Sequence, residues 1–226
     1  DYFLRTLKVA CVHTSNKESL NKLRTALYNF DETSTRKALS YLFTPDAIVH
    51  MSWPFGDMRG PDQLYNNCFA PLATSIPDLE RRDWIVVGGL TDIGDEWVGC
   101  GGHYTGTFLA PWLDIPPTGH IVHMRFHEFY KFKEGKVIEV QAIWDIPEVM
   151  MQGDCWPMAP SLGREYHIPG PATLDGIVSG HWDEQKSNKS CSHIVEMLEY
   201  MKLHPSTGGP EAVSYTHLTL PTTKQV

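Results

Sequence analysis

The chain has 226 residues, 42% hydrophobic and 20% charged, which is enough to bury a core in one large domain. Its net charge of −8 at pH 7, without a basic run, argues against a nucleic-acid or anionic-membrane partner. The sequence shows no signal-peptide pattern and no apolar run long enough to span a bilayer, and its five cysteines form no CxxC pair. We therefore expect a cytoplasmic protein with reduced thiols.

Helical spacing of apolar residues characterises the first part of the chain. The residues from Ser15 to Phe30 show it behind a Ser15-x-x-Glu18 capping box. A second helix is expected from Thr33, its N-cap, through Leu42. Pro61 suits the first turn of a third helix that runs to about Leu72.

Strand patterns dominate the middle of the chain. We expect strands at 47–51, 84–90 and 97–108, and a β-hairpin from Ile121 to Asp145 that turns at Glu134-Gly135. Gly101-Gly102, inside the third of these strands, indicates a bulge that bends the sheet. The order of elements predicts an α+β fold in which the N-terminal helices cover one face of a curved antiparallel sheet.

The hairpin carries the most informative feature of the sequence. Side chains alternate between the two faces of a strand, so one face is predicted to be polar, with His123, Arg125, His127, Glu139 and Gln141. The other face is apolar except for one carboxylate, and it consists of Met124, Phe126, Glu128, Tyr130, Ile138, Val140, Ala142 and Trp144. A lone acid among apolar side chains favours two interpretations. It is either a general acid/base with a raised pKa, or a buried acid satisfied by Tyr130, Tyr104 or Arg125.

The C-terminal third differs in composition. Residues 153–185 are rich in proline and glycine and predict a linker after a first domain at residues 10–152. Apolar residues at helical spacing follow from Ser190 to Leu203, behind a Ser-Asn-Lys triplet that also precedes the first helix. We interpret 186–212 as the first helix of a truncated second copy and 213–226 as a sequencing-adapter artefact, so the chain is expected to be a fragment of metagenomic origin.

Several motifs occur in the order found in a known family. They are Phe43-x-x-Asp46-Ala47-x-Val49-His50, Gly60-Pro61, Ile76-Pro77-Asp78, Tyr104-Thr105-Gly106-x-Phe108, Ile115-Pro116-Pro117-Thr118-Gly119, and Phe129-Tyr130-x-Phe132-x-Glu134-Gly135-Lys136-Val137-x-Glu139. In these motifs the chain resembles the SnoaL-like polyketide cyclase and ester cyclase family of the nuclear transport factor 2-like superfamily. The resemblance implies a cone-shaped α+β barrel.

The resemblance also implies a chemistry and a site. Family cyclases close a ring by aldol condensation without a metal or organic cofactor, and a carboxylic acid in an apolar pocket moves the proton. The last long strand of many members carries a His and an Asp facing the pocket, but here Val140 and Ala142 occupy those positions. Glu128 is then the remaining candidate for the general acid/base, with His50 and Tyr104 as secondary candidates. Candidate substrate-binding residues are Trp53, Met124, Phe126, Tyr130, Val140, Ala142 and Trp144.

The predicted function follows from Glu128. The leading hypothesis is a cofactor-independent enzyme for aldol cyclisation, isomerisation or hydration of a small apolar or polyketide-like ligand. The alternative is a non-catalytic small-molecule-binding or interaction domain of the same fold. No metal is expected, because His123 and His127 lie roughly 13 Å apart along a strand and His120 points to the opposite face. The polar face of the hairpin is a candidate homodimer surface.

Overall fold

The computed structural model describes residues 2–159, 167, 169–174, 176–177 and 183–202, with the backbone alone for 2–11 and 202. The chain divides into two units, Asp1–Ser179 and Gly180–Val226. In the second unit a helix, α6 (Glu184–Lys202), overlaps the helix expected from Ser190. The proposed adapter segment lies outside the described residues. No helix among the described residues combines the length and apolar character needed to cross a membrane.

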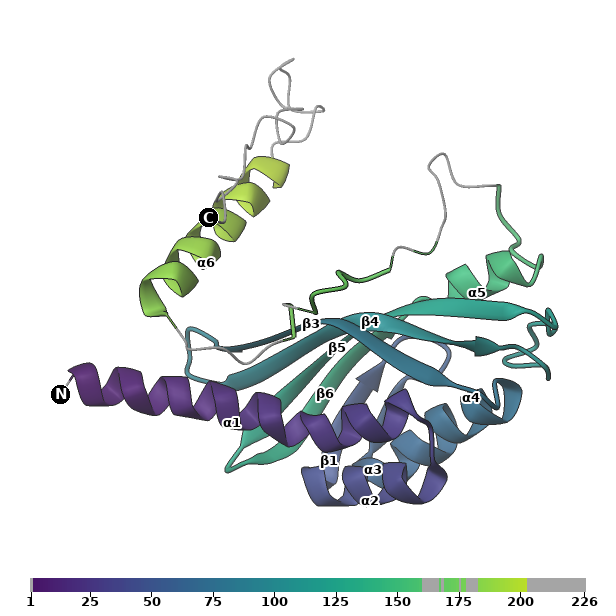
Figure 1. Cartoon of the computed structure of the whole chain (residues 1–226), viewed down its shortest axis with the longest axis horizontal. Helices are drawn as coiled ribbons and strands as arrows, with labels where there is room; N and C mark the ends of the chain where they lie inside the picture. The colour runs from purple at the N-terminus through teal and green to yellow at the C-terminus, as the bar shows by residue number, and fades with distance from the viewer. Residues whose placement is uncertain (1, 160–166, 168, 175, 178–182, 203–226) are drawn as a thin grey trace, which may run out of the picture. The chain divides into compact units, whose positions relative to one another are not determined.

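The first unit is built on one curved sheet of six strands in the order β2-β1-β6-β5-β4-β3 (Figure 1). The strands are β1 (Phe43–Met51), β2 (Asp57–Arg59), β3 (Glu80–Leu90), β4 (Glu96–Thr107), β5 (Ile121–Lys133) and β6 (Lys136–Trp144). The predicted α+β class is confirmed, but the sheet is mixed, since β1 runs parallel to β6. A pair joined by a hairpin must be antiparallel, whereas β1 and β6 are far apart in sequence and have no such constraint. The sheet is not closed, and β2 and β3 are its edges.

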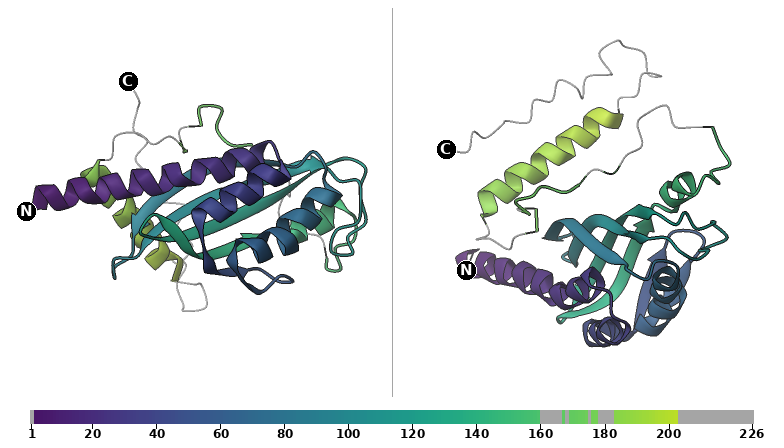
Figure 2. Two further views of the ribbon diagram at one scale, coloured as in Figure 1. Left: turned by 90° about the horizontal axis from the view of Figure 1, so that it is seen from below. Right: turned by 45° about the vertical axis from the view of Figure 1, so that its right-hand side comes forward.

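The helices before β3 cover one face of the sheet (Figures 1 and 2). They are α1 (Tyr2–Tyr28), α2 (Glu32–Leu42), α3 (Gly60–Leu64), a π-helical turn η1 (Tyr65–Phe69) and α4 (Ala70–Ser75). The predicted helix from Pro61 to Leu72 is thus present in three consecutive segments. A short helix that the sequence did not predict, α5 (Ile146–Gln152), follows β6 and lies against β5.

Two predicted helix starts are wrong. Helix α1 begins at Tyr2, so the Ser15-x-x-Glu18 motif lies inside the helix and caps nothing. Helix α2 is capped by Asp31, whose carboxylate accepts a hydrogen bond from the Ser34 amide at 2.7 Å, and not by Thr33. An Asp and a Thr are both good N-caps, and the sequence alone does not choose between neighbouring ones.

The hairpin of β5 and β6 forms as predicted. Glu134 and Gly135 both have positive φ, at 52° and 74°, which is typical of a tight hairpin turn. Glu128 pairs with Ala142 across the ladder. A register shift after Lys131 makes Ile138 an extra residue, so Val137 takes the buried position expected for Ile138.

A second irregularity shapes the site. The β3–β4 register shifts between Asp83 and Ile85, opposite Gly101 and Gly102, so the bulge expected at these glycines lies in the partner strand. A Cβ at Gly102 would lie 2.2 Å from the carbonyl oxygen of Arg82, and glycine is therefore required for the strands to approach this closely. Arg81 and Asp83 precede the bulge, and their side chains lie on the same face of β3 and interact.

Candidate functional site

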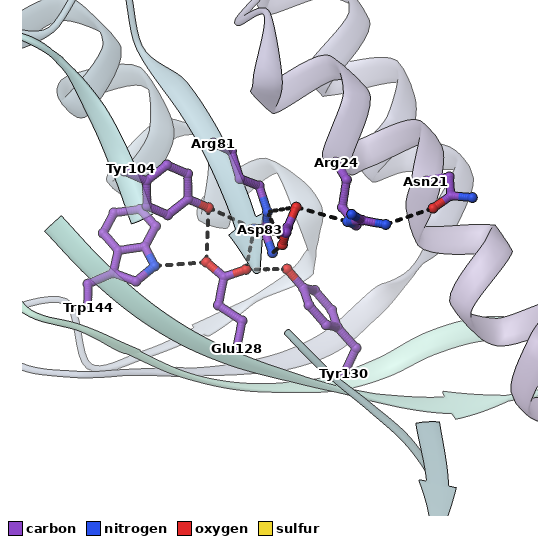
Figure 3. Close-up of polar contacts among 8 residues, drawn as sticks. All are labelled: Asn21, Arg24, Arg81, Asp83, Tyr104, Glu128, Tyr130 and Trp144. Atoms are coloured by element: carbon purple, nitrogen blue, oxygen red, sulfur yellow. Dashed lines mark hydrogen bonds and ion pairs between the residues drawn. The ribbon is translucent and has the colours of Figure 1, made fainter. Parts of the chain in front are cut away.

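Glu128 lies inside the unit, on the face of β5 that is turned toward the helices (Figure 3). Its side chain is 3% exposed. Oε1 accepts hydrogen bonds from the Tyr104 hydroxyl at 3.0 Å and the Trp144 indole at 2.9 Å. Oε2 accepts from Nη1 of Arg81 and from the Tyr130 hydroxyl, both at 2.5 Å. A carboxylate has about four acceptor positions, and each oxygen of Glu128 has two donors.

The contacts of Glu128 continue as a chain of alternating charges (Figure 3). Nη2 of Arg81, which is 1% exposed, lies 3.1 Å from Asp83. Asp83 in turn lies 2.9 Å from Nε of Arg24, on α1. Arg24 also donates to the side chain of Asn21 at 2.9 Å. We call this set of residues the Glu128 cluster. It consists of Glu128, Arg81, Asp83 and Arg24, together with the donors Tyr104, Tyr130 and Trp144.

The pKa shifts in the cluster favour fixed charges and fixed donors. Burial lowers the pKa of the Arg81 guanidinium, but Asp83 and then Glu128 more than offset this and raise it well above its usual value. Burial, together with the negative charge of Glu128, raises the pKa of the Tyr104 and Tyr130 phenols well above the usual value. Both phenols therefore remain protonated and keep donating to the carboxylate.

Aromatic rings pack around the cluster. The Trp144 ring centroid lies 5.1 Å from Tyr104, 5.6 Å from Phe69 and 5.7 Å from Phe55, and Tyr104 lies 4.8 Å from Phe126. The predicted lining residues on this face are all buried: Met124, Phe126, Tyr130, Val140, Ala142 and Trp144. The structure thus brings them together with Glu128 and Tyr104, and the rings among them pack against one another.

Two predicted site residues lie elsewhere. His50 alternates with the buried Val49 and Met51, so it points to the opposite face of β1, is 44% exposed and pairs with Asp57 at 2.7 Å. Trp53 is in the turn after β1 and is 85% exposed. Neither residue is part of the surroundings of Glu128, so the structure does not bring them together with the other candidates.

Sequence reasoning missed the charged partners of Glu128. The cation considered was Arg125, but this residue is on the opposite face of β5, where it pairs with Asp145 at 3.3 Å. The signal that could have found Arg81 and Asp83 is their i, i+2 spacing, which places both on one face of a strand. The predicted strand began at Trp84, so the preceding charged residues were left out of it.

A groove lies at the sheet edge formed by β3, and Arg24, Arg81 and Asp83 of the Glu128 cluster are part of its lining. It has a volume of about 1050 Å3 and is bounded by α1, by β3 and by described residues between His167 and Ile177. These last residues belong to the segment predicted as a linker, and the carbonyl of Gly176 accepts a hydrogen bond from the Val86 amide at 2.9 Å. We call this feature the β3 groove.

Three histidines gather on the face of the sheet that carries Arg125. The ring centroid of His167 lies 4.6 Å from His103 and 4.9 Å from His123, and Trp84 lies 4.6 Å from His103. Burial, followed by the charges of neighbouring histidines, lowers the pKa of His103 to about 3. No group of three potential ligands within the described parts of the chain is placed to hold a metal ion.

The arrangement of one curved mixed sheet with helices on one face defines an α+β domain. The model of the family described as SnoaL-like polyketide cyclase matches residues 21–153, which is more than half of the sequence. The chain therefore belongs to the SnoaL-like polyketide cyclase family, as the sequence motifs indicated.

Solved structures agree with this assignment at the level of the fold. A protein from Jannaschia sp. CCS1, classed with the SnoaL-like polyketide cyclases, is 24% identical with a TM-score of 0.53, over 65% of this chain and 95% of its own. IdmH from Streptomyces antibioticus, classed as a polyketide cyclase, is 19% identical with a TM-score of 0.50, over 61% and 96%. AclR from Streptomyces galilaeus, classed as a hydroxylase, is 17% identical with a TM-score of 0.54, over 66% and 91%. No curated protein matches the chain.

Proposed function

We propose that this chain is a small-molecule-binding member of the family in which Glu128 is a fixed structural charge and not a proton carrier. The single observation that carries the proposal is the saturation of the carboxylate by four donors. A general base needs an acceptor position that reaches the substrate proton. In Glu128 each of these positions holds an N–H or O–H group of the protein itself.

Neighbouring residues support the same proposal. Val140 and Ala142, at the positions where many family members carry a His and an Asp, have no titratable group and are buried beside Glu128. The donors to Glu128 are also engaged in hydrogen bonds, because the Tyr104 and Tyr130 hydroxyls donate to its carboxylate oxygens. Because the described donors and the acceptor at Glu128 are already hydrogen-bonded to one another, binding is the function that the geometry supports best.

The second candidate is a cofactor-independent cyclase, isomerase or hydratase that uses Glu128. The observation in its favour is the family membership, together with a carboxylate buried among Trp144, Phe126 and other rings. For this function the carboxylate would have to exchange one of its four donors for a substrate C–H. Such an exchange leaves a buried donor without a partner, at a cost of about 1–3 kcal/mol.

One substrate-like compound separates the two candidates. A naphthyl-substituted 1,3-diketone is neutral, contains a ring system and has an acidic C–H between two carbonyls. We expect the compound to bind the full chain saturably, as measured by the shift of the thermal unfolding midpoint. We expect no acceleration of hydrogen–deuterium exchange at that carbon. Exchange accelerated by the wild type and abolished in folded Glu128→Gln would reject the binding function in favour of the enzyme.

The homodimer through the polar face of the sheet also stays a prediction. That face carries exposed apolar side chains among its polar ones, including Phe129 and Ile143, at 46% and 64% exposed. Burial of such side chains is typical of a subunit interface. A monomeric mass in solution at micromolar concentration would contradict the dimer.

A further inference from the structure

The β3 groove offers open space for a ligand. Its volume of about 1050 Å3 is at the upper end of the range for small-molecule sites, which is roughly 300–1,000 Å3. The side chains around Glu128 are in contact with one another instead, as the ring distances of Trp144 and Tyr104 show. A ligand of several rings would therefore fit the groove without displacing core side chains.

The charges that line the groove are paired with one another. Arg24 and Arg81 contact Asp83 at 2.9 and 3.1 Å, and Arg82 contacts Glu80 at 2.5 Å. The remaining acid of the lining, Asp78, accepts hydrogen bonds from the backbone amide and hydroxyl of Thr107 at 2.6 and 2.7 Å. The three arginines and three acids of the described lining balance in formal charge. A charged ligand would have to break one of these pairs, whereas a neutral ligand would not.

The two walls of the groove differ in polarity. One wall is formed by the half-buried Trp84 and by apolar residues after it in the chain, namely Pro169, Pro171, Ala172, Leu174 and Ile177. The other wall is the face of α1 that carries Asn21, Thr25 and Tyr28. These three residues have i, i+4, i+7 spacing and lie on one side of the helix, where they present an amide and two hydroxyls.

We infer that the β3 groove binds a neutral, ring-containing small molecule that carries hydroxyl or carbonyl groups. Its rings pack against Trp84 and the apolar wall, and its polar groups bond to the side chains of Asn21, Thr25 and Tyr28. This inference rests on the proposed binding function and adds to it a site, outside the interior around Glu128, and a ligand class.

Three naphthalene compounds with different charges test the ligand class. They are naphthalene-1-methanol, which is neutral, 1-naphthoate and 1-naphthylmethylammonium. The full chain is labelled with 5-fluorotryptophan, and the fluorine resonances of Trp84 and Trp144 are assigned with Trp84→Phe and Trp144→Phe. We expect the neutral compound to shift the Trp84 resonance, which reports on the groove, and to bind at least about tenfold tighter than either ion. Equal or tighter binding of an ion would overturn the ligand class.

A filled groove tests the location. Thr25 is exposed on α1, so Thr25→Trp adds a bulky side chain inside the groove without disturbing the core. We expect this variant to weaken binding at least about tenfold, while Thr33→Trp, at an exposed position of α2, leaves it unchanged. A shift of Trp144 alone, insensitive to Thr25→Trp, would overturn the groove but keep the binding function. The absence of any shift at either tryptophan, together with no binding of the diketone, would overturn both.

Discussion

Nη1 of Arg81, on β3, lies 2.5 Å from Oε2 of Glu128, on β5, and both side chains are almost completely buried. The two strands are not neighbours, since β4 lies between them. The ion pair therefore passes over β4 on one face of the sheet and connects the edge strand β3 to the inner strand β5. Buried charges are tolerated when they are paired and hydrogen-bonded, as both are here.

Removing one donor to Glu128 should destabilise the protein. Tyr130→Phe deletes the hydroxyl that lies 2.5 Å from Oε2, and we expect it to lower the free energy of unfolding by about 1.5–3 kcal/mol. The matched control is Tyr41→Phe, because Tyr41 is 58% exposed and its change should stay within about 0.5 kcal/mol. Urea unfolding of both variants measures the difference, and equal stabilities would mean that the Tyr130 hydroxyl is not engaged.

The outer end of the charge chain should also contribute more than a surface ion pair. Arg24→Met leaves Asp83, 5% exposed, with one cation fewer, and we expect a loss of about 1–3 kcal/mol. Arg36 forms an exposed i, i+4 pair with Glu32 at the same N–O distance of 2.9 Å, so Arg36→Met should cost about 1 kcal/mol or less. Thermal unfolding ranks the two variants. If Arg36→Met proves the more damaging, the buried chain does not stabilise the fold as argued.

The close approach of β3 and β4 depends on Gly102. A methyl group there would meet the Arg82 carbonyl at 2.2 Å and the Phe126 ring at 2.7 Å, so we expect Gly102→Ala to cost more than about 2 kcal/mol or to prevent folding. Gly89, in the same sheet, has no atom within 4 Å of its added Cβ, and Gly89→Ala should be close to neutral. The yield of folded protein and the unfolding midpoint distinguish them. A stable Gly102→Ala protein would argue against the bulge geometry.

The protein should become less stable as the pH is lowered, because of the histidines near Trp84. The pKa of His103 is lowered to about 3 from its usual 6.5, and burial also lowers that of His123. The folded state therefore binds fewer protons than the unfolded state between pH 6.5 and about 3, and stability is lost as the pH falls through that window. Other charged groups also act on these histidines. Protonation of His103 is further opposed by Arg125, His127 and His167, whereas the Glu148 carboxylate lies 3.3 Å from His123.

A ring without a titratable nitrogen isolates this contribution. We expect His103→Phe to lose less stability than the wild type between pH 6.5 and 5, as measured by urea unfolding at each pH. His120→Phe, at an exposed position before β5, serves as the control and should keep the wild-type slope. Parallel pH profiles for His103→Phe and the wild type would show that His103 does not carry the effect.

The fold was largely predictable because local patterns and tertiary packing agree. The period-two alternation and the Glu134-Gly135 turn predicted the β5–β6 hairpin, and helical spacing predicted the packed part of α1. The parallel pairing of β1 with β6 was not predictable in the same way, since it joins segments far apart in sequence. The bulge that makes Ile138 an extra residue was not predicted either. Val137 and Ile138 are both apolar, so the sequence pattern does not show which of them takes the buried position.

The candidate site was predicted only in part. Alternation along β5 correctly places Glu128 among apolar residues, and it makes Tyr104 and Tyr130 reasonable partners. The role of Arg81 depends on the register of β3 against β4, which a bulge shifts and which a single sequence does not reveal. With Arg81 in place, the negative charge of Glu128 is compensated by a buried cation.

A double-mutant cycle between Arg81 and Glu128 tests the central claim most directly. We expect Arg81→Met and Glu128→Gln each to lower the free energy of unfolding by about 3–5 kcal/mol. Arg81→Met leaves the buried Glu128 carboxylate without its cation, and Glu128→Gln leaves Arg81 only Asp83, which Arg24 also contacts. The double variant removes both charges and keeps a carbonyl for the Tyr104 and Trp144 donors, so it should be more stable than either single variant. Losses that simply add in the double variant would contradict the account of Glu128 as the structural counter-charge of Arg81.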